Sequence, residues 1–405
     1  MRQTTGRLWM AGLRALGRLV LIAALLAGLT GCWDRREIND LAVAMGLGID
    51  KLDGKYRISV QVVNPTKVAM LESGGSGAPV VLYSSVGRTM FEAFRLLTEE
   101  VPRKVYFSHL QLLVIGQGLA EEGIRDVVDM ISRNYEFRPS FYFAIADNAS
   151  PEQILSIPSA IDPIPANEQR KSLEESERVW ASTIKVTYDQ LINDFSEPGN
   201  NSVLTGVAIH GRQISDYKEI NRISLLSRLK YSQSAAFQGD RFVGWLSTSA
   251  SKTYNYMHNH VQDTIGIVPC PGGGVYSLDV LKKPITTIHI VLQDDIPKVD
   301  VHIKMRGNIS EMLCNAKFTR HGLKELERNA EESLIKVMDE GLEEVITVHK
   351  TDVLGIGRAV HAQYPEYWKK NKHRWDDIFP QINVNVTADI SIRDFGETTE
   401  RVKVY

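Results

Sequence analysis

Residues 299–305 read Val-Asp-Val-His-Ile-Lys-Met, so apolar and polar side chains alternate along this stretch. The alternation predicts a strand with one buried face. Further along, apolar residues recur at helical spacing from Leu323 to Val345, and glutamates such as Glu331 and Glu332 fill the other positions. This pattern predicts a long helix that packs with one face and meets solvent with the other.

A second helix and a last strand complete this region. Thr351-Asp352 can cap a helix that runs to about Ala362 and closes at Pro365,. Residues 382–392 alternate again, which predicts another strand,. We therefore expect residues 285–405 to form a C-terminal α+β domain, an antiparallel sheet packed by two helices.

Aromatic residues cluster between that helix and the last strand. The candidates are Tyr367, Trp368, Trp375 and Phe379. Aromatic side chains bury large areas and dominate both cores and interfaces. The favoured interpretation is core packing, and the alternative is a surface that a partner contacts.

The middle of the chain, residues 181–284, is rich in strand patterns. Residues 203–210 are expected to be a strand, and residues 235–237 and 241–246 a strand pair around the two-residue hairpin turn Gly239-Asp240,. After the triple glycine at 272–274, residues 275–280 and 285–292 are expected to form a strand pair. A β-rich middle domain is predicted.

Residues 32–180 are expected to form an N-terminal mixed α/β domain. Residues 38–50 and 56–63 flank the turn signal Asp53-Gly54, which predicts a hairpin,. Strand and helix patterns then alternate up to residue 146, as in a mixed sheet covered by helices,. The prolines of residues 150–167 predict a boundary region. The expected class is α+β, with three mixed α/β domains, each a sheet covered by helices.

The first 31 residues have the pattern of an export signal. Four arginines and no acidic residue precede the apolar run at 19–28, which is too short to span a bilayer. Leu29-Thr30-Gly31-Cys32 follows and resembles the lipobox of bacterial lipoproteins. There, the cysteine thiol receives a diacylglyceryl group and the chain is cut just before it. Residues 1–31 are therefore predicted to be a signal peptide and Cys32 the lipidation site. The alternative is an ordinary secretory signal with a chance cysteine.

Composition narrows the possible functions. Removing the four arginines of residues 1–31 leaves 43 of the 47 basic residues against 49 acidic ones. No basic excess remains for binding nucleic acid. Beyond Cys32 only Cys270 and Cys314 remain, and their pairing cannot be deduced from the sequence.

The sequence contains none of the common catalytic or metal-binding motifs, so no enzyme activity, cofactor or metal is expected. His258-Asn259-His260 could offer two imidazoles to a metal, but a polar loop is the better interpretation,. His109 lies in an apolar stretch, where a buried histidine bonded to the backbone is expected.

Several blocks together resemble the C subunits of nutrient germinant receptors, the Ger(x)C lipoproteins of spore-forming bacteria. They include residues 32–38 (Cys-Trp-Asp-Arg-Arg-Glu-Ile), 351–357 (Thr-Asp-Val-Leu-Gly-Ile-Gly) and 375–380 (Trp-Asp-Asp-Ile-Phe-Pro). The resemblance implies a three-domain α+β protein, anchored by lipid on the outer face of the spore inner membrane. The resemblance also implies that the protein works beside an A subunit and an integral-membrane B subunit and has no enzyme activity of its own. The loop at 73–79 and the triple glycine depart from the family pattern.

A receptor subunit without covalent chemistry must act through its surfaces. The candidate partner surface directly follows the anchor and comprises Trp33, Asp34, Arg35 and Glu37. The alternative function is a lipid-anchored solute-binding protein that delivers a nutrient to a membrane transporter. An envelope hydrolase ranks third because no reactive centre is recognisable.

Overall fold

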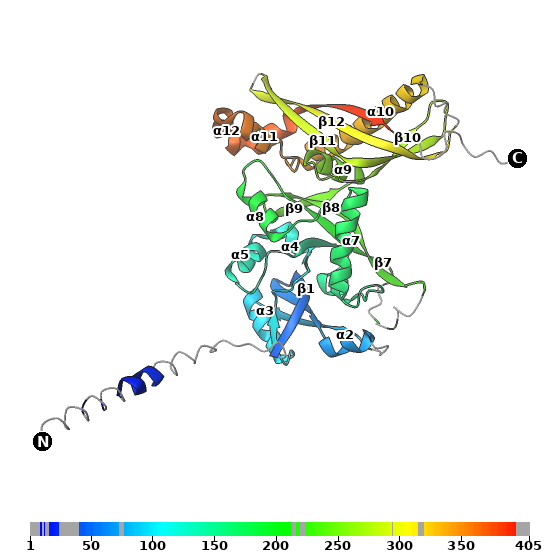
Figure 1. The fold of residues 1–405 in the computed structure, drawn as a ribbon. Helices are drawn as coiled ribbons and strands as arrows, with labels where there is room; N and C mark the ends of the chain where they lie inside the picture. Colours follow the sequence, from blue (N-terminus) through cyan, green and yellow to red (C-terminus); the bar gives the residue numbers. More distant parts are fainter. Residues whose placement is uncertain are drawn as a thin grey trace. The chain divides into compact units, whose positions relative to one another are not determined.

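A computed structural model describes residues 40–72, 77–212, 223–293, 295–314 and 320–393, together with positions 9, 12, 16–23, 216 and 218. Residues 42–405 form one compact unit. Within it, helices pack on two separate sheets (Figure 1). No helix in the described part of the chain is long and apolar enough to cross a membrane. The predicted α+β class is confirmed.

The larger sheet has nine strands in the described residues, in the order β3-β2-β1-β5-β6-β7-β8-β9, and β4 also pairs with β1. The predicted hairpin is confirmed as β1 and β2, which pair antiparallel. Strands β1, β5, β6 and β7 run parallel, and the other pairs along the order run antiparallel. The strands are β1 (Leu41–Leu52), β2 (Lys55–Val63), β3 (Val80–Gly87), β4 (Lys104–Tyr106), β5 (Leu112–Gly116), β6 (Tyr142–Asp147), β7 (Val203–Gly211), β8 (Ser227–Gln238) and β9 (Arg241–Leu246).

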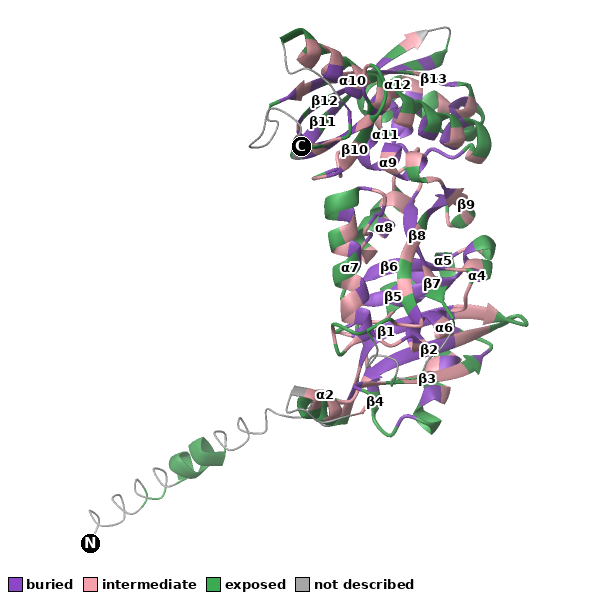
Figure 2. Cartoon of the chain, turned by 90° about the vertical axis from the view of Figure 1, so that its right-hand side faces the viewer, coloured by how far each residue is buried: buried purple, intermediate pink, exposed green. Residues whose placement is uncertain are grey.

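Both faces of the central parallel strands are covered. Leu113 and Phe143 belong to the main core, whereas Leu112 and Ala144 belong to a second cluster on the opposite face. Figure 2 shows β5 and β6 as almost wholly buried, as expected for parallel strands between helical layers. The helices are α2 (Pro65–Glu72), α3 (Met90–Leu96), α4 (Gln117–Glu122), α5 (Arg125–Arg133), α6 (Pro151–Ser156), α7 (Pro165–Trp180) and α8 (Tyr188–Ser196).

The proline-rich stretch at 150–167 is more regular than expected. Pro151 and Pro165 occupy the first positions of α6 and α7, where a missing N–H breaks no helical hydrogen bond. The Ser150 hydroxyl caps α6 by accepting a hydrogen bond from the backbone N–H of Gln153 at 3.2 Å. These prolines therefore start helices and do not mark a structureless boundary.

The expected β-rich middle domain is not a separate sheet. Strand β7 pairs parallel with β6, Ala144 opposite Thr205, so β7, β8 and β9 continue the first sheet. The described residues thus hold two sheets where three were expected. The domain boundaries drawn at residues 181 and 285 stay predictions.

The second sheet has the order β10-β11-β12-β13, and the expectation that it is wholly antiparallel is wrong for its last strand. Strand β13 runs parallel to β12, with Val301 opposite Val386. The helical connection between them carries the chain back to the end of the sheet at which β12 begins. Residues 275–280 and 285–292, expected to pair together, belong to one long strand. The strands are β10 (Ile265–Pro269), β11 (Val275–Gln293), β12 (Ile296–Met312) and β13 (Asn383–Ile392).

The predicted long helix is confirmed as α10 (Arg320–Glu343), which buries Leu326, Leu334 and Leu342. Its acidic side is not merely solvated, however. The Glu331 and Glu327 carboxylates accept hydrogen bonds from the backbone N–H groups of Ile390 and Ile392, at 3.1 and 3.0 Å. These glutamates cover part of the free edge of β13, where unpaired donors would otherwise face solvent. The remaining helices are α9 (Thr248–Met257), α11 (Ile356–Gln363), α12 (Pro365–Asn371) and α13 (Trp375–Ile378).

Candidate functional site

The buried residue Asp352 connects the C-terminal helices to each other and to the segment before β7. Asp352 accepts hydrogen bonds from the backbone N–H groups of Ile356 and Gly357, at 3.1 and 2.6 Å, and from the Trp375 indole at 2.9 Å. The backbone carbonyl of Asp352 accepts a hydrogen bond from the backbone N–H of Asn201 at 2.9 Å. Burial raises the pKa of the Asp352 carboxyl to about 6, against the lowering effect of these donors. The N-cap position of α11 is Gly355 and not Thr351 or Asp352, but the Asp352 side chain accepts the first N–H groups of this helix and also ties it to α13.

Two glycines allow close packing at this junction. Gly199, in the turn after α8, has φ +79°, and a Cβ there would overlap the Trp368 ring. A Cβ on Gly357 would lie 2.6 Å from the Gly199 carbonyl oxygen, closer than a Cβ approaches another heavy atom in folded proteins. The turn after α8 and the start of α11 therefore meet backbone to backbone.

The four aromatic candidates lie in and beside this junction. Trp368, Trp375 and Phe379 are 2%, 3% and 0% exposed, and the two indole rings meet edge to face at 5.1 Å. Tyr367 is partly exposed, and its hydroxyl donates to the Asp295 carbonyl at 2.5 Å. The three buried rings pack inside the chain, and only Tyr367 presents area to solvent.

A cavity of about 740 Å³ adjoins the junction, within the usual size range of small-molecule sites. Its walls come from the segment before α8, from α8 and the turn after it, from α9 and the loop that follows, and from α11. The lining residues are Ile184, Lys185, Val186, Gln190, Asn193, Asp194, Ser196, Glu197, Pro198, Tyr254, His258, His260, Arg358 and His361.

Three rings line the cavity side by side. The Tyr254 and His258 rings are 4.3 Å apart, and the His258 and His260 rings are 5.6 Å apart. His258 Nε2 lies 2.9 Å from the Val353 carbonyl oxygen, and Nδ1 lies 3.3 Å from Nη2 of Arg358. Because a guanidinium only donates, His258 Nδ1 accepts and Nε2 carries the proton. Burial lowers the pKa of His258 to about 4, so this ring is neutral at pH 7.

Charges of both signs line the same cavity. Arg358 Nη1 and Glu197 Oε2 lie 3.8 Å apart, and these side chains are 46% and 41% exposed. Lys185 Nζ pairs with the buried Glu177 at 2.8 Å. Asp194 accepts hydrogen bonds from Asn200 at 2.8 Å and Ser202 at 3.1 Å, and burial raises the pKa of its carboxyl. Lys185 and Asp194 are thus held by the protein, while the Arg358–Glu197 pair is long for a hydrogen bond.

The histidines singled out from the sequence have different surroundings. His258 and His260 both line the cavity, and among the described residues no group of three or more His, Cys, Asp or Glu is placed to hold a metal. His109 is exposed, in the turn between β4 and β5, so the expectation that it is buried is wrong. The apolar stretch around it breaks there into two strands, which periodicity did not reveal.

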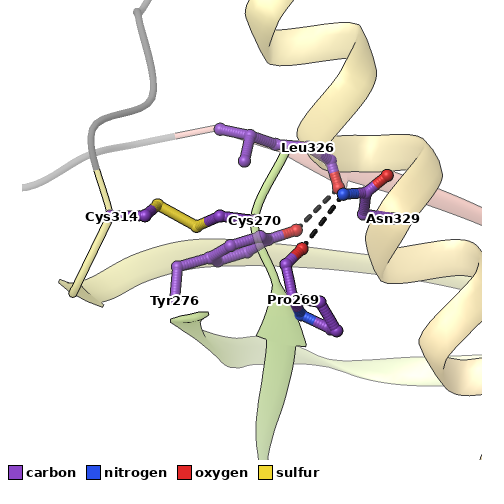
Figure 3. The surroundings of a disulfide bond; sticks show 6 residues. All are labelled: Pro269, Cys270, Tyr276, Cys314, Leu326 and Asn329. Carbon is purple, nitrogen blue, oxygen red and sulfur yellow. Dashed lines mark hydrogen bonds between the residues drawn. A yellow bond between two sulfur atoms is a disulfide. The ribbon is translucent and has the colours of Figure 1, made fainter. Parts of the chain in front are cut away.

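Cys270 and Cys314 form a disulfide, which the sequence alone left open. Cys270 follows β10 and Cys314 follows β12 (Figure 3). Nearby, the Tyr276 hydroxyl donates to the Leu326 carbonyl at 2.6 Å, and the Asn329 amide donates to the Pro269 carbonyl at 3.0 Å. The disulfide and these two bonds hold the ends of β10 and β12 near α10.

The predicted lipidation site and the candidate partner surface are not among the residues that the structure describes. Cys32, Trp33, Asp34, Arg35 and Glu37 lie outside the described residues.

Two family models match the chain in succession. The model for the spore germination protein N-terminal domain matches residues 34–209, and the spore germination B3/GerAC-like C-terminal model matches residues 232–396. No motif in the sequence points to the cavity. Its walls come from both matched regions, because residues 184–198 lie in the first and residues 254–361 in the second.

Relatives of known sequence cover nearly the whole chain. Spore germination protein KC of Bacillus subtilis (strain 168) is 29% identical, over 95% of this chain and 96% of the relative. Spore germination protein B3 of the same strain is 25% identical, over 92% and 96%. The crystal structure of the GerBC protein superposes with a TM-score of 0.53 at 19% identity, covering 89% of this chain and 99% of that one. This last likeness shows the fold.

Proposed function

Because the chain belongs to the GerAC-like family of spore germination proteins, we propose that it is the C subunit of a nutrient germinant receptor. In this proposal it is held by a diacylglyceryl group on Cys32 at the outer face of the spore inner membrane. It works beside A-type and B-type subunits and performs no catalysis of its own. The observation that carries the proposal is the match of both family models, in order, along the chain.

The disulfide supports the proposed side of the membrane. Cys270 and Cys314 are bonded in the structure, and disulfides persist mainly outside the reducing cytosol. Export followed by anchoring at Cys32 would place this bond in an oxidising compartment. Trp33 would then follow the lipid at the membrane interface, where an indole is favoured. Asp34, Arg35 and Glu37 would be the first polar groups available to a membrane-embedded partner.

We predict that Cys32→Ala abolishes lipid attachment. No other thiol stands in the signal region, and two acyl chains are needed for stable anchoring. Growth with a labelled fatty acid, followed by capture of the protein, should show label on the wild type and none on the variant. Cys270→Ala should keep its label. A labelled Cys32→Ala protein would contradict the proposed anchor.

Deleting the gene should abolish germination in response to particular nutrients and leave germination by non-nutrient triggers intact. A complementing allele should restore the response. An allele with both Asp34→Asn and Glu37→Gln should restore it only weakly, because partner contacts near the membrane would be lost. Circular dichroism should show that this double variant folds as the wild type does.

The cavity of about 740 Å³ keeps one alternative open, a lipid-anchored solute-binding protein. A deletion strain that germinates normally with every nutrient, yet fails to take up one solute during growth, would establish it. The neighbouring genes also discriminate. The receptor proposal expects genes for a large A-type subunit and a multi-span B-type subunit, whereas the alternative expects the permease and ATPase of an uptake system.

A further inference from the structure

We propose that the cavity between α8, α9 and α11 binds a small zwitterion, with Arg358 receiving its anionic group and Glu197 its cationic group. The inference stands on the geometry of the cavity. Only its reading as direct recognition of a nutrient by this subunit rests on the proposed function.

The Arg358–Glu197 pair points to a ligand with both charges. Its atoms are 3.8 Å apart, and each side chain is nearly half exposed, so each has hydrogen-bonding capacity left for a ligand. An α-amino acid, with its ammonium and carboxylate on one carbon, could replace this long contact with two short charge-assisted hydrogen bonds. A ligand with a single charge would be attracted by one partner and repelled by the other.

The other charged groups of the cavity are already held by the protein. Lys185 is paired with the buried Glu177, and both Asp194 oxygens accept hydrogen bonds from neighbouring side chains. His258 is neutral at pH 7 and uses both ring nitrogens within the fold. The exposed Arg358 and Glu197 are therefore the charged groups best placed to meet a ligand.

The rest of the cavity can receive a ligand's side chain. Ile184 and Val186 are buried apolar residues, and the Tyr254 ring is 5% exposed. His260 Nδ1 is buried and has no hydrogen-bond partner among the described residues. A buried polar atom without a partner is costly, so a polar group on the ligand that reached it would gain affinity. The wall thus combines apolar contact with one open polar position.

Such a ligand would bridge the two regions matched by the family models. Glu197 belongs to the first region and Arg358 to the second. A molecule bound to both would favour conformations in which the turn after α8 and the start of α11 stay together. Binding would thereby increase the population of these conformations, and a receptor subunit needs such a response to its ligand.

Calorimetry on the full chain in detergent micelles tests the proposal. Each of the twenty common L-α-amino acids is titrated singly into the wild type, and at least one is expected to bind. Arg358→Gln and Glu197→Gln should each weaken that binding by about 10-fold or more, the loss of a charged contact. The control is Arg125→Gln, which removes another exposed, ion-paired arginine that does not line the cavity. It should bind as the wild type does.

Analogues of the amino acid that binds separate the two charges. The carboxylic acid without the amino group, and the amine without the carboxylate, should both bind more weakly than the amino acid. Glu197→Gln should not weaken binding of the acid, and Arg358→Gln should not weaken binding of the amine.

Three results would overturn the proposal: no amino acid binds the wild type, binding is unchanged in both cavity variants, or one single-charge analogue binds as tightly as the zwitterion. These outcomes leave the receptor proposal untouched, because that proposal is tested by germination of the deletion strain.

Discussion

Replacing Cys270 and Cys314 together by alanine is expected to lower the free energy of unfolding by about 4 kcal/mol. The bond joins residues 44 positions apart, and a cross-link over a loop of this length removes much of the freedom of the unfolded chain. The native state should change little. The hydrogen bonds of Tyr276 with Leu326 and of Asn329 with Pro269 still hold β11 and the end of β10 on α10 (Figure 3).

Denaturant unfolding followed by circular dichroism measures this effect. The midpoint should fall in the double variant while the native spectrum is retained. Wild-type protein unfolded with a reductant present should match the variant, because both lack the cross-link. Equal midpoints for oxidised wild type and variant would show that the bond does not form in the folded protein.

Asp352→Ala is expected to destabilise the protein by about 3 kcal/mol at pH 7. It leaves the N–H groups of Ile356 and Gly357 and the Trp375 indole without their acceptor, and each buried unsatisfied donor costs about 1–3 kcal/mol. Relief of the burial penalty on the carboxylate, which shows as its raised pKa, offsets part of this loss. Thermal unfolding of variant and wild type measures the difference.

Asp352→Asn is the matched control and should lose clearly less. Its amide oxygen can still accept from Gly357 and Trp375, which share one carboxylate oxygen in the wild type. The Ile356 N–H, which donates to the other carboxylate oxygen, would then face an amide nitrogen. A loss equal to that of the alanine variant would show that the negative charge, and not the acceptor geometry, holds the junction.

The wild type and Asp352→Asn should also differ in how their free energy of unfolding depends on pH. The folded-state pKa of Asp352 is raised from 3.8 to about 6, so the folded state binds the proton more tightly than the unfolded chain. This contribution to stability is complete below pH 4 and is lost as the pH rises through about 6. The stability of the wild type relative to Asp352→Asn should therefore fall over this window, by up to about 3 kcal/mol.

His258 contributes in the opposite direction. Its folded-state pKa is lowered from 6.5 to about 4, so its contribution is complete above pH 6.5 and is lost as the pH falls through about 4. The wild type and Asp352→Asn share this contribution of His258 to stability. It cancels in the comparison, and the difference curve reports Asp352 alone.

Local patterns in the sequence were sufficient for the elements that bury one face. The alternation in residues 299–305 and 382–392 predicted β12 and β13, and the spacing from Leu323 to Val345 predicted α10. The turn signal Asp53-Gly54 predicted the first hairpin. In each case the periodicity of side-chain burial follows directly from backbone geometry, so neighbouring residues carry the information.

Pairing between elements could not be predicted in this way. A strand with one buried face has the same pattern whether its partner runs parallel or antiparallel, so the parallel pairing of β13 with β12 was missed. For the same reason β7 was not recognised as a neighbour of β6. The glutamates of α10 looked solvated because their partners, the N–H groups of Ile390 and Ile392, lie on a distant strand.

By itself, the sequence determined the α+β class, the long helix and its packing face, and the resemblance to a family whose models match most of the chain. Only the tertiary structure decided that Cys270 meets Cys314, that Asp352 ties α11 to α13, and that Glu197 pairs with Arg358 at the wall of a cavity. The physical reason is the range of the interactions. Helix and strand patterns arise between near neighbours in the chain, whereas a disulfide, a buried carboxylate with its donors and a cavity wall need side chains that only the folded chain brings together.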